Sequence, residues 1–320
     1  MELLYSHEHD TMAVALDVTN NCNFRCVHCF NNSGECNQVI EMKDEEFLKL
    51  AEDIIKLKPL NLCFCGGETL IKVDLIYKLL DIFRTHIPVI NIVSNGYFFT
   101  PEVAKKLKKL GISGIQFSLD GAYSWQHDSF RQFNGAFNKV FEAIKIANDN
   151  DFIVDISFVP NRVNYMSLPI LFKELLENKL TIRRFNTMPL IPMGRGNFNR
   201  KWILEDNEMA VFIQIINDLK VKYQGVYDVL LGDPIDHYFR MKNNYKLGMK
   251  ASHIGIRANG DVVASPYVDF IVSNVRKKNL VDIWEDNYKN IWGNVEWLSY
   301  IDDIYTIDDL SRKEYYNMEN

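Results

Sequence analysis

Residues 12–30 read MAVALDVTNNCNFRCVHCF, an apolar run that gives way to a polar corner and then to three closely spaced cysteines. The run at 12–18 has the length and the apolar content of a buried strand. Cys22, Cys26 and Cys29 follow it at spacings of four and three residues, so a single loop can wrap three thiolates around one metal group. The stretch therefore predicts a strand whose carboxyl end carries a metal-binding loop.

The same succession of a short apolar run and a helical pattern recurs along the first two thirds of the chain. Further apolar runs lie at 60–65, 89–93, 114–119, 152–159 and 181–187, and helical patterns begin near 44, 72, 100, 136 and 168. Six strand-then-helix units in succession predict an α/β fold in which helices cover a parallel sheet. Active sites of such folds lie at the carboxyl ends of the strands, and the notable polar clusters of this chain all follow a predicted strand.

The last third of the chain departs from this alternation. Its helical patterns lie at about 205–222 and 279–292, and its two short apolar runs lie at 253–257 and 261–264. Ala258-Asn259-Gly260 joins the two runs, and Asn-Gly in that position is a strong hairpin signal. We therefore expect a core domain at 1–200 and a smaller α+β module at 201–320.

Composition excludes several classes of protein. The 320 residues are 47% hydrophobic and 24% charged, with a net charge of −6 and no long run of Lys or Arg, so no nucleic-acid partner is expected. The first residues lack the basic start and apolar centre of a secretory signal. No window reaches about 18 consecutive apolar residues, so we expect no membrane span and a cytoplasmic protein.

All six cysteines lie in the first fifth of the chain. Disulfide frameworks are typical of short secreted chains, so this crowding favours a metal. Iron–sulfur clusters usually take four cysteines, and three in the loop would leave one iron open for a ligand. The alternative is a zinc site, for which His28 or Cys36 would supply the fourth ligand.

The motifs after the other strands extend the pattern of the cysteine loop. They are Gly66-Gly67-Glu68, Ser94-Asn95-Gly96, the stretch QFSLDG at 116–121, Met188-Pro189-Leu190 and Gly194-Arg195-Gly196. In this order the chain resembles the radical S-adenosylmethionine (SAM) superfamily. The resemblance implies a partial (β/α)6 TIM-like parallel barrel. It also implies one 4Fe–4S cluster on Cys22, Cys26 and Cys29, whose open iron binds SAM and whose electron cleaves it to a 5′-deoxyadenosyl radical.

The resemblance also assigns expected contacts to SAM. Gly66 and Gly67 let the backbone approach its methionine part, because they lack a Cβ, and Glu68 adds negative charge; Thr69 replaces the proline that usually follows in the family. The other expected contacts are Asn95 and Ser118 for ribose or carboxylate, Arg131 for the carboxylate, and Val159, Leu190 and His28 around adenine. Simple packing, turn formation and surface ion pairing are the alternatives for these residues.

Three cysteines remain outside the loop. Cys63 and Cys65 share one face of the second strand, because side chains alternate along a strand. Buried cysteine is commonly a small apolar residue. The alternative is a thiol that returns a hydrogen atom to a substrate radical, and Cys65 and Cys36 are the candidate catalytic residues for it.

The C-terminal hairpin and the helix near Trp284 resemble the SPASM or twitch module, which usually binds auxiliary clusters. No cysteine follows residue 65, and Ala264 and Ser265 stand where a cysteine before proline is expected, so we expect no auxiliary cluster. The resemblance implies maturation of a ribosomally made peptide, by cross-linking or epimerisation. A small-molecule substrate and a non-catalytic metal-binding scaffold are the alternatives.

The expected partners follow from this chemistry. An electron donor such as flavodoxin or ferredoxin must reduce the cluster. The cysteine loop begins within about 22 residues of the start, so we expect no separate leader-binding domain, and a partner protein would then recognise the leader.

Overall fold

The computed structural model describes residues 13–34 and 40–319. Its chain divides into two compact units. The first unit comprises the described parts of Met1–Asn21, Glu35–Asn91 and Pro234–Asn320, and the second comprises Cys22–Gly34 and Ile92–Asp233. The C-terminal segment thus groups with the N-terminal strands, whereas the sequence suggested a division near residue 200.

A mixed sheet forms the centre of the first unit. Its strands run in the order β11 (Tyr316–Asn317), β10 (Phe270–Asn274), β9 (Asp261–Val263), β8 (His253–Ile256), β1 (Ala13–Asp17) and β2 (Asn61–Cys65). β1 pairs in parallel with both β2 and β8, while β8 and β9 form the predicted antiparallel hairpin. The C-terminal strands therefore continue the sheet that the N-terminal strands begin.

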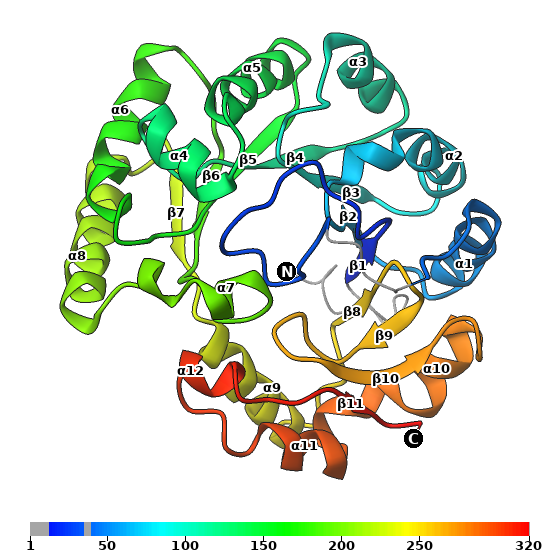
Figure 1. Cartoon of the computed structure of the whole chain (residues 1–320). Helices are drawn as coiled ribbons and strands as arrows, with labels where there is room; N and C mark the ends of the chain where they lie inside the picture. The colour runs from blue at the N-terminus through cyan, green and yellow to red at the C-terminus, as the bar shows by residue number, and fades with distance from the viewer. Residues whose placement is uncertain (1–12, 35–39, 320) are drawn as a thin grey trace. The chain divides into compact units, whose positions relative to one another are not determined.

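The described residues of the first unit form six α-helices. They are α1 (Asp44–Lys56), α2 (Val73–Phe83), α9 (Pro234–Lys246), α10 (Leu280–Asp286), α11 (Val295–Ile301) and α12 (Ile307–Leu310). Figure 1 shows α1 and α2 beside β1 and β2, and α10 beside β10. α1 buries the apolar stripe Phe47, Leu50, Ala51 and Ile54, and it begins at Asp44, with Lys43 as its cap, where the helical pattern was expected to begin.

The second unit is built on four parallel strands. These are β4 (Gly114–Ser118), β5 (Ile153–Phe158), β6 (Arg184–Thr187) and β7 (Asp228–Leu231), paired in that order. Its helices are α3 (Pro101–Lys109), α4 (Ser124–Arg131), α5 (Ala136–Asp149), α6 (Leu168–Glu177), α7 (Arg195–Phe198) and α8 (Asp206–Lys222). The boundary between the units falls within β3 (Val89–Ser94).

The six strands expected from the sequence are confirmed, and the parallel α/β class with them. Thr100 caps α3 through its side chain, with Pro101 in the first turn, as the sequence indicates. The sixth strand begins at Arg184, later than its apolar run at 181. No helix within residues 13–34 and 40–319 is long and apolar enough to cross a membrane.

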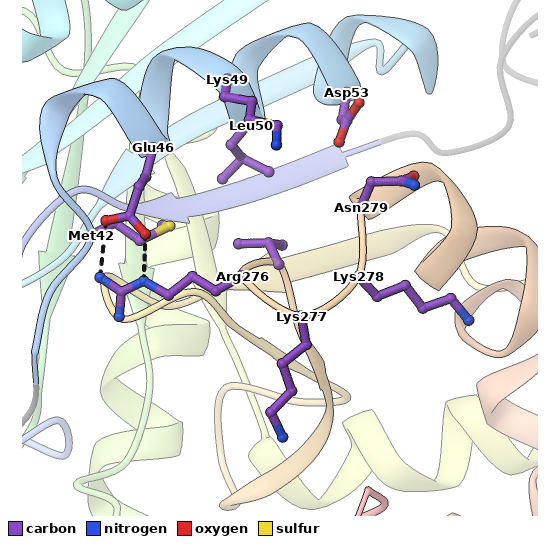
Figure 2. Close-up of a pocket in the computed structure, with 10 residues that line it drawn as sticks. Met42, Glu46, Lys49, Leu50, Asp53, Arg276, Lys277, Lys278 and Asn279 are labelled. Carbon is purple, nitrogen blue, oxygen red and sulfur yellow. Dashed lines mark hydrogen bonds and ion pairs between the residues drawn. The ribbon is translucent and has the colours of Figure 1, made fainter.

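A pocket of about 390 Å³ lies in the first unit between α1 and the loop that follows β10. Figure 2 shows Arg276 reaching across to Glu46. The Arg276 Nε donates to Glu46 at 2.7 Å, and its Nη2 donates to the Glu41 carbonyl at 2.7 Å. Because its donors are used in this way, Arg276 fastens α1 to the C-terminal loop.

Candidate cluster and cofactor site

The three loop cysteines are free thiols in the second unit. Cys26 is buried, and Cys22 and Cys29 are half-buried. They pack with Phe24, Ala136, Tyr97 and Phe133 in one apolar cluster. Because the side chains of this cluster exclude water, the loop offers the dry, sulfur-rich surroundings that an iron–sulfur cluster requires.

Each of the three sulfurs accepts one hydrogen bond. The Phe24 amide donates to Cys22 Sγ at 3.4 Å, and the Ser33 amide donates to Cys29 Sγ at 3.4 Å. The Arg131 Nη1 donates to Cys26 Sγ at 3.7 Å. Such bonds stabilise thiolates and help to set the potential of a cluster. The donor set therefore fits the thiolate ligands of an iron–sulfur group.

Arg195 holds the backbone of the cysteine loop. Its Nε donates to the Cys26 carbonyl at 2.8 Å, its Nη1 donates to the Ser33 carbonyl at 2.9 Å, and its amide donates to the Cys29 carbonyl at 3.0 Å. Gly194 has φ +50°, and a Cβ there would lie 2.5 Å from the Phe30 carbonyl oxygen. The Gly-Arg-Gly motif was visible in the sequence, but its structural role was not.

Within the described ranges, no group of three His, Cys, Asp or Glu side chains is arranged to hold a single metal ion. The His28 ring stacks on Phe130, with ring centroids 3.9 Å apart. Burial and the charge of Arg131 hold the pKa of His28 well below its usual value, so its imidazole is neutral. Cys36, the other possible zinc ligand, lies outside the described residues.

Asp120 and Arg131 form a buried ion pair. The Arg131 Nε donates to Asp120 Oδ2 at 2.6 Å, and Nη2 lies 2.5 Å from the same oxygen. Asp120 Oδ1 accepts from the Val159 amide at 2.7 Å. The Asp120 carboxylate is fully buried, and burial raises its pKa while Arg131 opposes the rise. The guanidinium thus already binds one carboxylate, and its expected contact with SAM stays a prediction.

Asn95 links its loop to the cysteine loop. Its Nδ2 donates to Asn23 Oδ1 at 2.9 Å, and its Oδ1 accepts from the Tyr97 amide at 2.9 Å. Ser118 is the half-buried last residue of β4, and Leu190 is buried. These positions hold Asn95 and Ser118 at strand ends, as expected, while their contacts with SAM stay predictions.

The glycines of the first unit allow two backbone segments to meet. Gly66 has φ +141°, and a Cβ there would lie 2.3 Å from the Thr19 carbonyl oxygen. A Cβ on Gly67 would lie 2.3 Å from the Asn21 carbonyl oxygen. The Gly67 amide donates to the Thr19 carbonyl at 2.8 Å. The glycines are therefore required by the fold itself, before any ligand is considered.

Glu68 caps a short helix. It is buried, and its Oε1 accepts from the Leu70 amide at 3.0 Å at the start of the 3₁₀ helix Thr69–Lys72. The sequence prediction gave Glu68 a role beside SAM. The structure gives its carboxylate a structural role, and the contact with SAM stays a prediction.

The radical SAM superfamily model matches residues 16–175, half of the chain. The chain therefore belongs to the radical SAM superfamily. It is a radical SAM enzyme, which removes support from the alternative of a non-catalytic scaffold. Members of this superfamily use SAM together with a 4Fe–4S cluster.

The chain is similar to three known proteins over most of its length. The chain is 23% identical to an AdoMet-dependent heme synthase of Methanosarcina barkeri, over 85% of this chain and 82% of that protein. It is 22% identical to a PqqA peptide cyclase of Granulibacter bethesdensis, over 85% and 73% respectively. SuiB of Streptococcus suis has a TM-score of 0.71 at 16% identity, over 96% of this chain and 76% of SuiB. The last likeness shows the fold of a radical SAM enzyme with a TIM-like barrel.

Proposed function

We propose that the chain binds one 4Fe–4S cluster through Cys22, Cys26 and Cys29 and abstracts a hydrogen atom from a ribosomally made peptide. The observation that carries this proposal is the loop in which each of these sulfurs accepts a hydrogen bond. When bound, the cluster and SAM supply the 5′-deoxyadenosyl radical. The protein supplies binding, orientation and the exclusion of water.

Different residues of the chain bind different parts of SAM. The Gly66 and Gly67 carbonyls accept from the ammonium of its methionine part. Asn95, Ser118 and Arg131 bind its ribose and carboxylate. Val159, Leu190 and the flat ring of His28 flank adenine.

A peptide is the favoured substrate because peptide-modifying proteins recur among the similar proteins. SuiB has been solved with its precursor peptide SuiA, and another relative is a mycofactocin maturase of Mycobacterium tuberculosis. Strand β11 is the outermost described strand of this sheet, and adding a strand to a sheet edge is one recognised way of binding an extended peptide. An electron carrier such as flavodoxin or ferredoxin reduces the cluster, and a separate protein recognises the leader.

A small molecule of the tetrapyrrole class is the second candidate substrate. It is favoured by the AdoMet-dependent heme synthase, whose similarity spans 85% of the chain.

Anaerobic reconstitution of the wild-type chain tests the proposal. We expect about four irons and four sulfides per chain, and 5′-deoxyadenosine after reduction with SAM. Alanine at each loop cysteine should abolish the cluster, while Cys63→Ala serves as the matched control that keeps it.

The substrate class is decided by adding candidates to the holoenzyme. A precursor peptide encoded beside the gene should accelerate SAM cleavage and change in mass or stereochemistry. Turnover of an iron tetrapyrrole, with no peptide turned over, would reject the peptide proposal.

A further inference from the structure

Two thiols face the same side of β2. Cys63 and Cys65 alternate with Leu62 and Phe64, which are fully buried on the other side of the strand. The two sulfurs are 3.5 Å apart, with Cys65 Sγ as the donor. Cys65 directly precedes Gly66. The pair therefore lies beside the glycine segment that the proposed function assigns to SAM.

A carboxylate stands directly opposite this pair. Asp17 ends β1, and the parallel register places it across from Cys65. The Asp17 carboxylate is half-buried, and no residue in the described part of the chain forms a hydrogen bond with it. Burial raises the pKa of Asp17 to about 6, although the charge of Arg257 opposes the rise. Arg257 is itself bound to Asp269 at 2.6 Å, so it is not committed to Asp17.

We propose that Cys65 donates a hydrogen atom to the carbon radical of the substrate, with Cys63 and Asp17 as its positioning residues. This inference rests on the proposed function. It selects one of the two outcomes that the sequence leaves open, because a hydrogen atom returned to carbon completes an epimerisation and forms no cross-link.

The step balances without a net change in charge. A C–H bond forms on the substrate, the Cys65 S–H bond breaks homolytically, and the unpaired electron moves from carbon to sulfur. The sulfur radical then needs one electron and one proton to become a thiol again. A reduced iron–sulfur or flavin carrier supplies the electron, and solvent supplies the proton through the Asp17 carboxyl group.

Hydrogen-atom donation requires the neutral thiol, because a thiolate carries no hydrogen. The bond to Cys63, burial, and the charges of Cys63 and Asp17 raise the pKa of Cys65 well above its usual value. The charge of Arg257, which directly follows β8, acts on Asp17, and β3 contributes no titratable side chain. The surroundings of Cys65 therefore preserve its S–H bond.

The first test measures the Cys65 pKa in the holoenzyme. Alkylation by iodoacetamide is followed against pH by mass spectrometry of the peptide that carries both thiols. Asp17→Asn and Cys63→Ala should each move the Cys65 profile to lower pH, because each removes a group that raises the pKa. Asp286→Asn is the matched control, since it removes an exposed carboxylate of the same unit that pairs with Lys278 and should leave the profile in place. Unmoved profiles in both test variants would overturn the positioning roles.

The second test uses the holoenzyme, reductant and SAM alone in D2O. A radical generated without substrate should take the exchangeable hydrogen of Cys65, so the 5′-deoxyadenosine should carry deuterium. Cys65→Ala should lose most of that label, and Asp286→Asn should keep it. Unlabelled product from the wild type, or the same label in Cys65→Ala, would overturn the assignment. Labelled product from an enzyme that turns over no peptide would instead reject the proposed substrate and leave the donor in place.

Discussion

Arg131→Met should destabilise the second unit by about 3–5 kcal/mol. The substitution keeps an unbranched apolar stem and removes the guanidinium that holds Asp120 and Cys26. Asp120 is fully buried, and its Oδ2 would lose both contacts to Arg131, at 2.6 and 2.5 Å. Removing one partner of a buried ion pair leaves an uncompensated charge, which typically lowers the free energy of unfolding by about 3–5 kcal/mol.

A double-mutant cycle separates the charge effect from lost packing. In Asp120→Asn combined with Arg131→Met, the buried group is a neutral amide, which retains an oxygen for the Val159 amide. The double variant should therefore be more stable than Arg131→Met, although two side chains are changed. Urea unfolding at constant slope measures the four free energies. A loss below about 1 kcal/mol in Arg131→Met, or additive losses in the cycle, would refute this account of the pair.

The remaining predictions concern the glycine segment, the contact of Arg276 with Glu46 of α1, and the cysteine loop. Gly66→Ala should lower the free energy of unfolding by about 1–3 kcal/mol through backbone strain, with a further loss from the contact of its Cβ with the Thr19 carbonyl oxygen, and should weaken SAM binding by calorimetry; unchanged stability would show that the segment accommodates a Cβ. The bond to Arg276 lowers the pKa of Glu46 to about 2, so its stabilising effect is complete above the unfolded pKa of about 4.3 and is lost as pH falls through about 2. The protection factors of the α1 amides, corrected for the intrinsic exchange rate at each pH, should then fall in acid for the wild type and depend less on pH in Glu46→Gln. Arg195→Gln should release the backbone of the cysteine loop and lower the amount of iron that the protein retains in the presence of a chelator. Retention equal to that of the wild type would show that the loop keeps its conformation without Arg195.

Local pattern was sufficient for the six strands of the first two thirds of the chain and for most of their helices, although α4 and α7 were not predicted. Each predicted strand there is a short apolar run followed by an amphipathic helix, and both periods can be read from neighbouring residues. The last third was less predictable because its order depends on distant partners. β8 pairs with β1, some 240 residues earlier, and no property of either segment alone specifies that pairing. β7, β10 and α9 were not predicted at all.

The candidate site shows the same division. The spacing of Cys22, Cys26 and Cys29 is local, so the sequence identified the loop. The donor to the Cys26 sulfur is Arg131, and donors to the Cys26 and Cys29 carbonyls come from Arg195, both more than 100 residues away. The sequence offered SAM as the partner of Arg131, because a guanidinium pairs with carboxylates in general, and the buried carboxylate of Asp120 was not recognised as a competitor.

The pairing of β1 with β8 also changes how the C-terminal module must be studied. β1 has β2 on one edge and β8 on the other, and Arg276 ties the loop after β10 to α1. A truncation before β8 would therefore expose an edge of the first strand and remove a partner of the first helix. Loss of turnover in such a fragment would report a damaged sheet as readily as a lost docking surface. Because unpaired strand edges also promote aggregation, the contribution of this module to substrate binding is better measured with single substitutions on β8 to β11 that preserve the pairing.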